Sequence, residues 1–144
     1  MHDLAALDDA VIKQLKDNAD VFRQVETLDS EEDLLDSNLP TASAFVLIGR
    51  GQFKTPIGNT NYQEGTLDVS VFVVARNVRG KGAARKRNDG AYALITAAGD
   101  ALLGFEPAGG NGALYLVSIA SVLVDKVSAI YEIVFRFDLS EEPC

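Results

Sequence analysis

Residues 66–75, TLDVSVFVVA, decide the fold, because they carry the clearest strand pattern in the chain. Every second residue from Leu67 to Ala75 is apolar, so these side chains point to one face of a strand. The other face carries Asp68, Ser70, Phe72 and Val74. This alternation predicts a long β-strand whose Leu67 side carries an unbroken apolar row.

A strongly basic segment, residues 76–87 (RNVRGKGAARKR), follows that strand directly. It holds six of the thirteen Lys and Arg residues of the chain and no acidic residue. They are Arg76, Arg79, Lys81, Arg85, Lys86 and Arg87. A charged loop held between two rigid elements is a common place for molecular recognition, so the basic segment is a candidate contact surface.

An alanine-rich helix is expected after the basic segment, capped by Asn88 or Asp89 and ending near Leu103. Its apolar stripe consists of Tyr92, Ile95, Gly99 and Leu102, widened by Leu94, Ala98 and Ala101. The spacing makes Tyr92 a core residue whose hydroxyl finds a partner, rather than a site residue. The many small residues allow the helix axis to lie close to the layer beneath it.

Upstream, the sequence predicts a first helix over residues 4–18, capped by Asp3. Residues 21–26 indicate a short strand at a sheet edge. Residues 29–38 are acidic and form either a loop or a short helical turn opened by Ser30. The apolar run 44–48 is typical of a strand covered on both faces.

The polar segment 52–65 contains Gly and Pro, and it is either a mobile arm or a long hairpin between two strands. Two further strands are expected over residues 114–124 and 128–139, joined by a hairpin at Asp125-Lys126. In the last strand, Tyr131, Ile133, Phe135, Phe137 and Leu139 face inward, whereas Glu132, Arg136 and Asp138 face outward.

The order of elements is therefore α-β-β-β-α-β-β. It predicts an α+β fold in which two helices pack on a mostly antiparallel sheet of four to five strands. The length of 144 residues fits a single domain over 1–144, with the polar segment 52–65 as a candidate arm that orders only on assembly.

The charge is unevenly distributed along the chain. The net charge is −8, and residues 1–40 contain eleven acidic and three basic residues, whereas the basic segment carries +6. An acidic protein is a poor general binder of nucleic acid, since phosphate contacts need positive surface. Patches of opposite sign suit head-to-tail association between copies. The N-terminus lacks a signal-peptide pattern, and no apolar stretch spans a membrane, so we expect a soluble intracellular protein.

The residues for catalysis or metal binding are scarce. His2 is the only histidine and Cys144 the only cysteine, too few for a usual N/S metal site or a disulfide within the chain. Acidic residues 31–36 lack the spacing of a calcium loop. Gly80-Lys81-Gly82 precedes a helix and is a possible anion site, but it does not complete a phosphate-binding motif. We expect no enzyme activity, cofactor or metal.

Three interpretations of the basic segment remain open at this point. It is a solvated turn, a contact surface for an acidic neighbour, or a surface that contacts nucleic-acid backbone. Base stacking is unsupported, because residues 76–87 contain no aromatic side chain.

Residues 71–105 resemble the tail terminator family of Mu-like contractile-tailed phages and prophages. An apolar strand runs into Ala75-Arg76-Asn77-x-Arg79-Gly80, and after the basic loop Gly90-Ala91-Tyr92 opens an apolar helix. This signature covers about a quarter of the chain. The remaining elements agree with the family in size and order only.

The resemblance implies a structural protein of the virion tail, at its head-proximal end, assembled in the host cytoplasm. Members form a homo-hexameric ring on the last ring of the tail tube. The ring stops growth of tube and sheath and gives the head-side connector a docking surface. By this resemblance the partners are further copies, tail tube and sheath proteins and the connector. DNA would pass through the ring without sequence-specific binding, and no membrane is involved.

In this interpretation the basic residues contact acidic residues of a neighbouring copy, or of the tube or sheath protein. The candidate acidic residues are Asp29, Glu31, Glu32, Asp33 and Asp36. Arg76 has an alternative, which is to pair with a carboxylate in its own subunit. Two other functions remain as alternatives: another neck or tail-completion protein, and an anion- or nucleotide-binding enzyme that uses the loop at Gly80.

Overall fold

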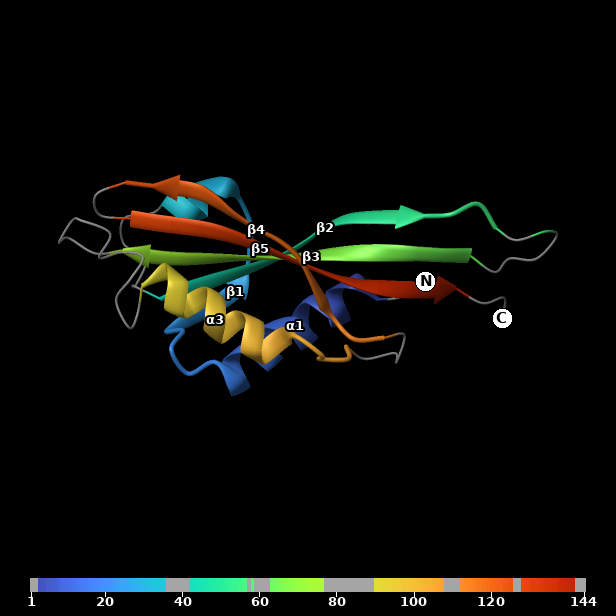
Figure 1. Cartoon of the computed structure of the whole chain (residues 1–144), viewed down its shortest axis with the longest axis horizontal. Helices are drawn as coiled ribbons and strands as arrows, with labels where there is room; N and C mark the ends of the chain where they lie inside the picture. The colour runs from blue at the N-terminus through green and yellow to red at the C-terminus, as the bar shows by residue number, and fades with distance from the viewer. Residues whose placement is uncertain are drawn as a thin grey trace.

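Strand β3 (Gln63–Arg76) contains the sequence TLDVSVFVVA and lies at the centre of a five-stranded sheet with the order β1-β2-β3-β5-β4. The computed structural model describes residues 3–35, 42–56, 58, 63–76, 90–107, 112–125 and 128–141. The other elements are α1 (Leu4–Asn18), β1 (Gln24–Thr27), the 3₁₀ turn η1 (Glu31–Leu35), β2 (Ser43–Phe53), α3 (Ala91–Leu102), β4 (Tyr115–Val124) and β5 (Ser128–Glu141). This order confirms the predicted α+β fold (Figure 1).

The sheet is mixed. Strand β1 runs parallel to β2, and the pairs β2–β3, β3–β5 and β4–β5 are antiparallel. The prediction of a mostly antiparallel sheet is therefore confirmed, with β1 as the parallel exception. Parallel neighbours need a crossover connection, and the segment between β1 and β2, which contains η1, provides it.

Both helices cover one face of the sheet, here called the helix face (Figure 1). Helix α1 begins and ends as predicted, and the Oδ1 atom of Asp3 accepts a hydrogen bond from the backbone N–H of Ala6 at 3.2 Å. Helix α3 begins one residue later than a cap at Asp89 predicts and two residues later than a cap at Asn88 predicts, with Gly90 at the N-cap position and no side-chain cap. Glycine is one of the residues favoured at the N-cap position, and the backbone of Gly90 has the extended conformation of a cap.

The main core lies between the helices and the sheet. It joins Leu7, Val11 and Leu15 of α1 to the odd-numbered residues of β3 that the alternation predicts. A second, smaller cluster lies on the opposite face, here called the open face. There Leu34 of η1 packs on Phe45, Val74 and Ile130.

Strands β2 and β3 form a hairpin that extends beyond the helices, and the end of β5 lies beside β3 (Figure 1). The register pairs Phe53 with Gly65, and Gln63 with Glu141. The two ends of the segment 52–65 therefore pair with each other as a hairpin, and residues 57 and 59–62 lie outside the described residues. We call residues 49–56 and 63–66 the arm.

Candidate assembly surfaces

Arg76 ends β3 and contacts its own subunit. Its Nη1 atom donates to the hydroxyl of Ser128 at 3.1 Å, and its Nη2 atom donates to the backbone carbonyl of Leu34 at 3.0 Å. Ser128 is the residue opposite Arg76 in the β3–β5 register. The half-buried guanidinium therefore holds the acidic turn η1 against the sheet.

The acidic turn is built from the candidate residues of the sequence. Asp29, Glu31 and Glu32 are exposed, and the half-buried Asp33 accepts a hydrogen bond from the backbone N–H of Ser30 at 3.2 Å. This bond opens the 3₁₀ turn, so Ser30 and Asp33 stabilise its start together. Leu34, which is 4% exposed, anchors the turn on the open face.

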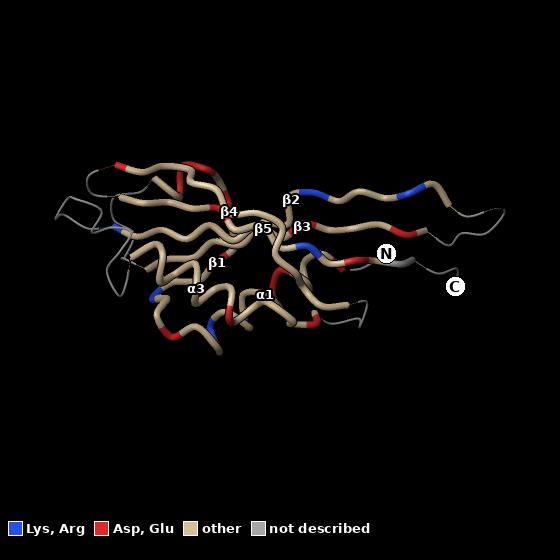
Figure 2. The backbone as a smooth tube through the Cα atoms, in the orientation of Figure 1, with Lys and Arg blue, Asp and Glu red and all other residues tan. Residues whose placement is uncertain are grey.

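The two charged candidate regions meet within one chain at Arg76 and η1. Asp36, Arg79, Lys81, Arg85, Lys86 and Arg87 lie outside the described residues. The structure thus brings together the start of the basic segment and the acidic turn, and leaves the other basic candidates as predictions. Figure 2 shows acidic residues near the end of the sheet where η1 lies, and basic residues along β2 in the arm.

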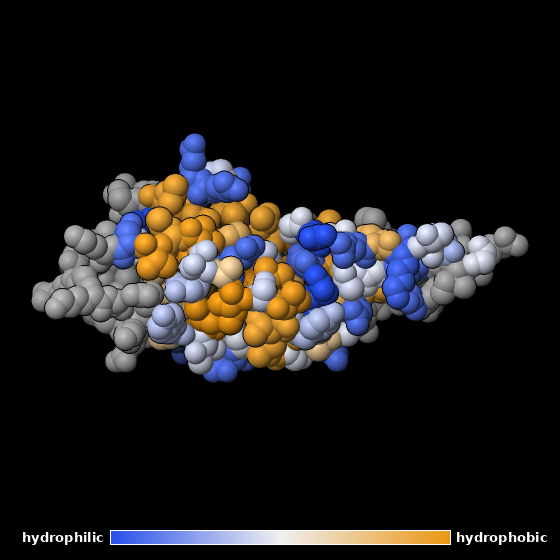
Figure 3. Space-filling view, turned by 45° about the horizontal axis from the view of Figure 1, so that its top comes forward, coloured by the Kyte–Doolittle hydropathy of each residue, from blue (hydrophilic) through white to orange (hydrophobic). Residues whose placement is uncertain are grey.

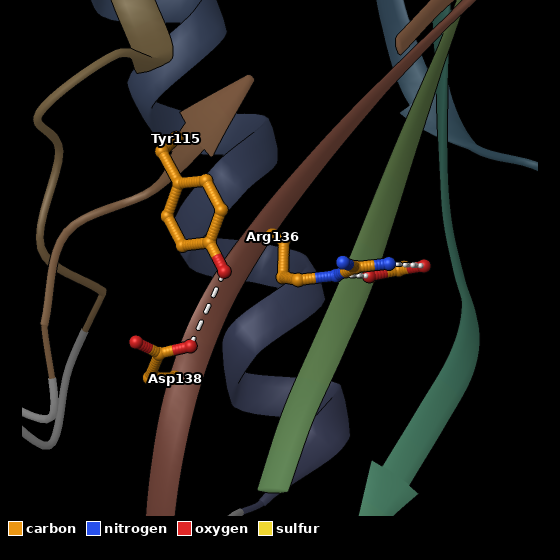
Figure 4. A network of polar contacts seen from close by, with 4 residues as sticks. Tyr115, Arg136 and Asp138 are labelled. Atoms are coloured by element: carbon orange, nitrogen blue, oxygen red, sulfur yellow. Dashed lines mark hydrogen bonds and ion pairs between the residues drawn. The ribbon is translucent and has the colours of Figure 1, made fainter. Parts of the chain in front are cut away.

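A polar row crosses the open face where the arm begins (Figure 4). Arg136 of β5 binds Asp68 of β3 through two contacts, Nε to Oδ1 at 2.6 Å and Nη2 to Oδ2 at 3.2 Å. The hydroxyl of Tyr115 donates to Oδ1 of Asp138 at 3.2 Å. Asp68, Arg136 and Tyr115 occupy one register position on three adjacent strands.

These contacts shift two pKa values upward. The hydrogen bond to Asp68 raises the pKa of Arg136 above its ordinary value, so this side chain stays charged. Partial burial, followed by the negative charge of Asp138, raises the pKa of Tyr115, so its hydroxyl stays protonated. The row is a structural link between strands, because every group in it already has a partner of opposite polarity.

Strand β4 carries the most conspicuous apolar surface among the described residues. Six of its ten side chains are large, apolar and between 41% and 51% exposed: Tyr115, Leu116, Val117, Ile119, Val122 and Val124. Figure 3 shows apolar surface gathered over the part of the molecule that carries this strand. The sequence predicted the strand but not its exposure. The feature that could have indicated this exposure is the run of ten residues without a charge in the penultimate strand.

Tyr92 was predicted as a core residue, and this prediction is wrong. Its side chain is 44% exposed, and its ring meets that of Tyr131 edge to face, with centroids 6.1 Å apart. The buried side of α3 consists of Ala91, Leu94, Ala98, Ala101 and Leu102. The small residues dominate that side because α3 packs directly on the sheet, and this rotates Tyr92 to the rim.

No group of three or more His, Cys, Asp or Glu residues is placed for a metal ion within the described part of the chain. Among the same residues, no helix combines the length and the apolar character needed to cross a bilayer.

The comparisons with known proteins agree with this arrangement. A solved structure titled "Virion of native gene transfer agent (GTA) particle" contains a chain with the same fold, at a TM-score of 0.62 and 20% sequence identity. The match covers 96% of this chain and 97% of that chain. No curated protein matches the chain. Residues 1–142 match the family described as phage tail terminator protein. Because the match extends over nearly the whole sequence, the chain belongs to the phage tail terminator family, whose members are structural proteins of the phage tail.

Proposed function

We propose that this protein forms a homo-hexameric ring at the head-proximal end of a contractile phage tail. The ring caps the tail tube and sheath, stops their polymerisation and provides the surface on which the head-side connector docks. The observation that carries this proposal is the family match over residues 1–142. The long uncharged edge of β4 supports it, since an exposed strand edge favours association with another chain.

The proposed partners are further copies of the chain, the tail tube and sheath proteins, and the connector. Assembly takes place in the host cytoplasm, and DNA passes through the ring without sequence-specific contact. In this role the protein acts through shape and surface chemistry, so it requires no catalytic residue and no cofactor.

The charged regions take different parts in this proposal. Arg76 contributes to the fold of its own chain through its hydrogen bonds to the Ser128 hydroxyl and the Leu34 carbonyl. We assign the contact with acidic neighbours to Arg79, Lys81, Arg85, Lys86 and Arg87. The acidic residues proposed to meet them on a neighbouring copy are Asp29, Glu31, Glu32, Asp33 and Asp36. Exposed pairs of this kind contribute orientation and association rate more than affinity.

Deletion of the gene from a phage or prophage that carries it tests the capping function. We expect tails of uncontrolled length in electron micrographs of the lysate, and tails of normal length when the intact gene is supplied in trans. Tails of normal length that fail to join heads would instead identify a different neck or tail-completion protein. A small particle stabilised by nucleotides, with no effect on tails, would favour an enzyme.

A further inference from the structure

Strand β4 is the last strand of the sheet, and its outer edge lacks two of the usual protections against pairing, a charged residue and Pro. Its sequence, YLVSIASVLV, contains neither a charged residue nor Pro over ten residues. Edge strands of soluble proteins are commonly kept short or carry Lys or Pro, because unpaired backbone N–H and C=O groups attract another strand. Strand β4 has two register irregularities, which also discourage pairing, but its ten uncharged residues without Pro favour cover of this edge by another chain.

Large apolar side chains flank this edge on both faces of the sheet. With six large apolar side chains at 41–51% exposure, divided between the two faces of the sheet, β4 exposes an apolar area on the order of 500 Å² in total. Added over both faces, this area is comparable to the largest single patches that monomers expose. It also supplies the greater part of the roughly 800 Å² that each partner buries in a stable interface.

A second free edge lies on the opposite side of the same sheet. Strand β1 pairs with β2 only from Ser43 to Val46, whereas β2 continues to Phe53. Among the described residues, the outer side of residues 47–53 has no strand beside it. This edge also exposes apolar side chains, Leu47 at 37% and Phe53 at 40%, and it carries a single charge, on Arg50.

The directions of the strands make the two edges compatible in a ring. Successive antiparallel pairing from β2 through β3 and β5 leaves β4 antiparallel to β2. Rotation about an axis along the strands preserves strand direction, so β4 of one copy meets β2 of the next in antiparallel orientation. Irregularities in the β4–β5 register, between Leu116 and Ser118 and between Ser121 and Leu123, increase the local twist of this edge.

We propose that the outer edge of β4 binds a second copy of this chain, at residues 47–53 of its β2, so that the sheet continues from subunit to subunit. This inference rests on the proposed ring and names the strands that form its subunit contact. The backbone hydrogen bonds of the added strand fix the register, and the apolar side chains of β4 supply the buried area.

Cysteine cross-linking tests the pairing of these two edges. Ser118 and Gln52 are both exposed and both lie on the open face, since they pair with Val134 and Thr66. In a Cys144→Ser background, S118C/Q52C protein treated with a short bis-maleimide should form a ladder of linked chains. Protein with S118C alone, Q52C alone or the control pair S118C/A5C should remain unlinked, because Ala5 lies on the exposed side of α1.

A charge on the edge provides an independent measurement. Ile119→Lys should weaken self-association about tenfold or more, since a Lys must lose its water when the edge is covered. Ala5→Lys adds the same charge on α1 and should leave association unchanged. Thermal unfolding of both variants, followed by circular dichroism, should remain close to wild type because both positions are exposed.

The outcomes separate this inference from the proposed function. Linked dimers from S118C alone would mean that two β4 strands pair with each other, which overturns the pairing with β2. If Ile119→Lys formed normal rings, or if the double-cysteine variant formed rings without cross-links, the contact between the two edges would be wrong. The proposal of a ring would still stand. If Ile119→Lys lost only attachment of a monomeric protein to isolated tails, the edge would belong to a tail protein and not to a second copy. Normal tail lengths after gene deletion would contradict the capping function whatever the cross-links show.

Discussion

Asp68 is a charged residue in the middle of the central strand, and Arg136 accounts for its presence there. Asp68 is 9% exposed and receives two contacts from the guanidinium directly opposite it on β5. A shift of the register by one residue would turn Asp68 towards the apolar core on the helix face. The pair therefore specifies how β3 and β5 align, in addition to any contribution to stability.

Arg76 provides a test of how the acidic turn is held. Arg76→Ala removes the donors to the Ser128 hydroxyl and the Leu34 carbonyl, so we expect a loss of about 1–3 kcal/mol in the free energy of unfolding. Urea denaturation measures this change. Arg23→Ala removes the same charge from an exposed site and should have almost no effect. Equal stability of the two variants would show that Arg76 does not anchor η1.

Asp8 gives the protein a small dependence on pH. Partial burial, together with the charge of Asp9, raises the pKa of this carboxyl above its ordinary value, against an opposing hydrogen bond to Thr27. A carboxyl whose pKa is raised by folding binds its proton more tightly in the folded state. The free energy of unfolding is therefore highest at pH values below the unfolded pKa, and this extra stability is lost as the pH rises through the folded pKa.

Asp8→Asn should therefore stabilise the protein at pH 7 by a few tenths of a kcal/mol, as expected for a half-exposed group. Near pH 3 the gain should vanish. Thermal unfolding at the two pH values measures the difference. A gain of the same size at both would exclude titration of Asp8 as its cause.

The arm is stabilised at the level of the element by one aromatic ring. The side chain of Phe53 lies over Gly51 and over Gly65, its partner across the hairpin. A Cβ atom at Gly65 would meet the Phe53 ring and would lie 2.5 Å from the backbone carbonyl oxygen of Gln52. Glycine is therefore required at position 65 by space, which lets the ring cover the backbone of both strands.

Gly65→Ala should destabilise the arm by about 1–3 kcal/mol, because the carbonyl of Gln52 belongs to the backbone and cannot move freely. Hydrogen exchange of the β2–β3 amides should show faster opening in the arm than in the rest of the sheet. Gly49→Ala is the matched control, since its Cβ atom would meet Leu47 at an ordinary 3.6 Å. Slower exchange at Gly65→Ala than at the control would contradict this packing argument.

Helix α3 shows why an apolar pattern alone misplaced Tyr92. Both sides of the helix are apolar, and the spacing cannot distinguish the side that meets the sheet from the side at the rim. The small residues Ala91, Ala98 and Ala101 decide the orientation, because they allow closer approach to β3 and β5 than a Tyr ring would. Tyr92 then packs against Tyr131 at the margin.

At the scale of the whole molecule, the charge is large and negative, so association between copies must overcome repulsion. A basic segment on each copy reduces this repulsion locally and attracts acidic neighbours. The apolar edge of β4 is suited to provide affinity, while the charges direct the approach. This division of roles makes different predictions for the two surfaces.

Replacing Arg85, Lys86 and Arg87 with Ala should leave the fold intact and slow ring assembly about tenfold at low salt, with a smaller difference from wild type at high salt. Light-scattering kinetics over a range of NaCl concentrations measures this. A variant with Lys13→Ala, Lys16→Ala and Arg23→Ala removes three positive charges elsewhere and should assemble faster than the first variant. Equal rates for the two variants would assign the effect to net charge and not to the basic segment.

The local pattern of the sequence determined the elements and their order. The spacing of apolar residues is set by the geometry of helix and strand, so α1, with its Asp3 cap, and the central and last strands could be predicted within a few residues. The family resemblance carried by residues 71–105 predicted membership that the match over residues 1–142 confirms.

Tertiary structure decided which surfaces remain exposed. The strand order leaves β4 at the edge of the sheet and lets β2 extend past β1. The spacing of apolar residues within a strand does not indicate which other strand it will pair with. The same holds for the contacts of Arg76 with η1 and of Arg136 with Asp68, which join residues 42 and 68 positions apart. Periodicity records only which way a side chain points, whereas what it meets depends on the packing of distant segments.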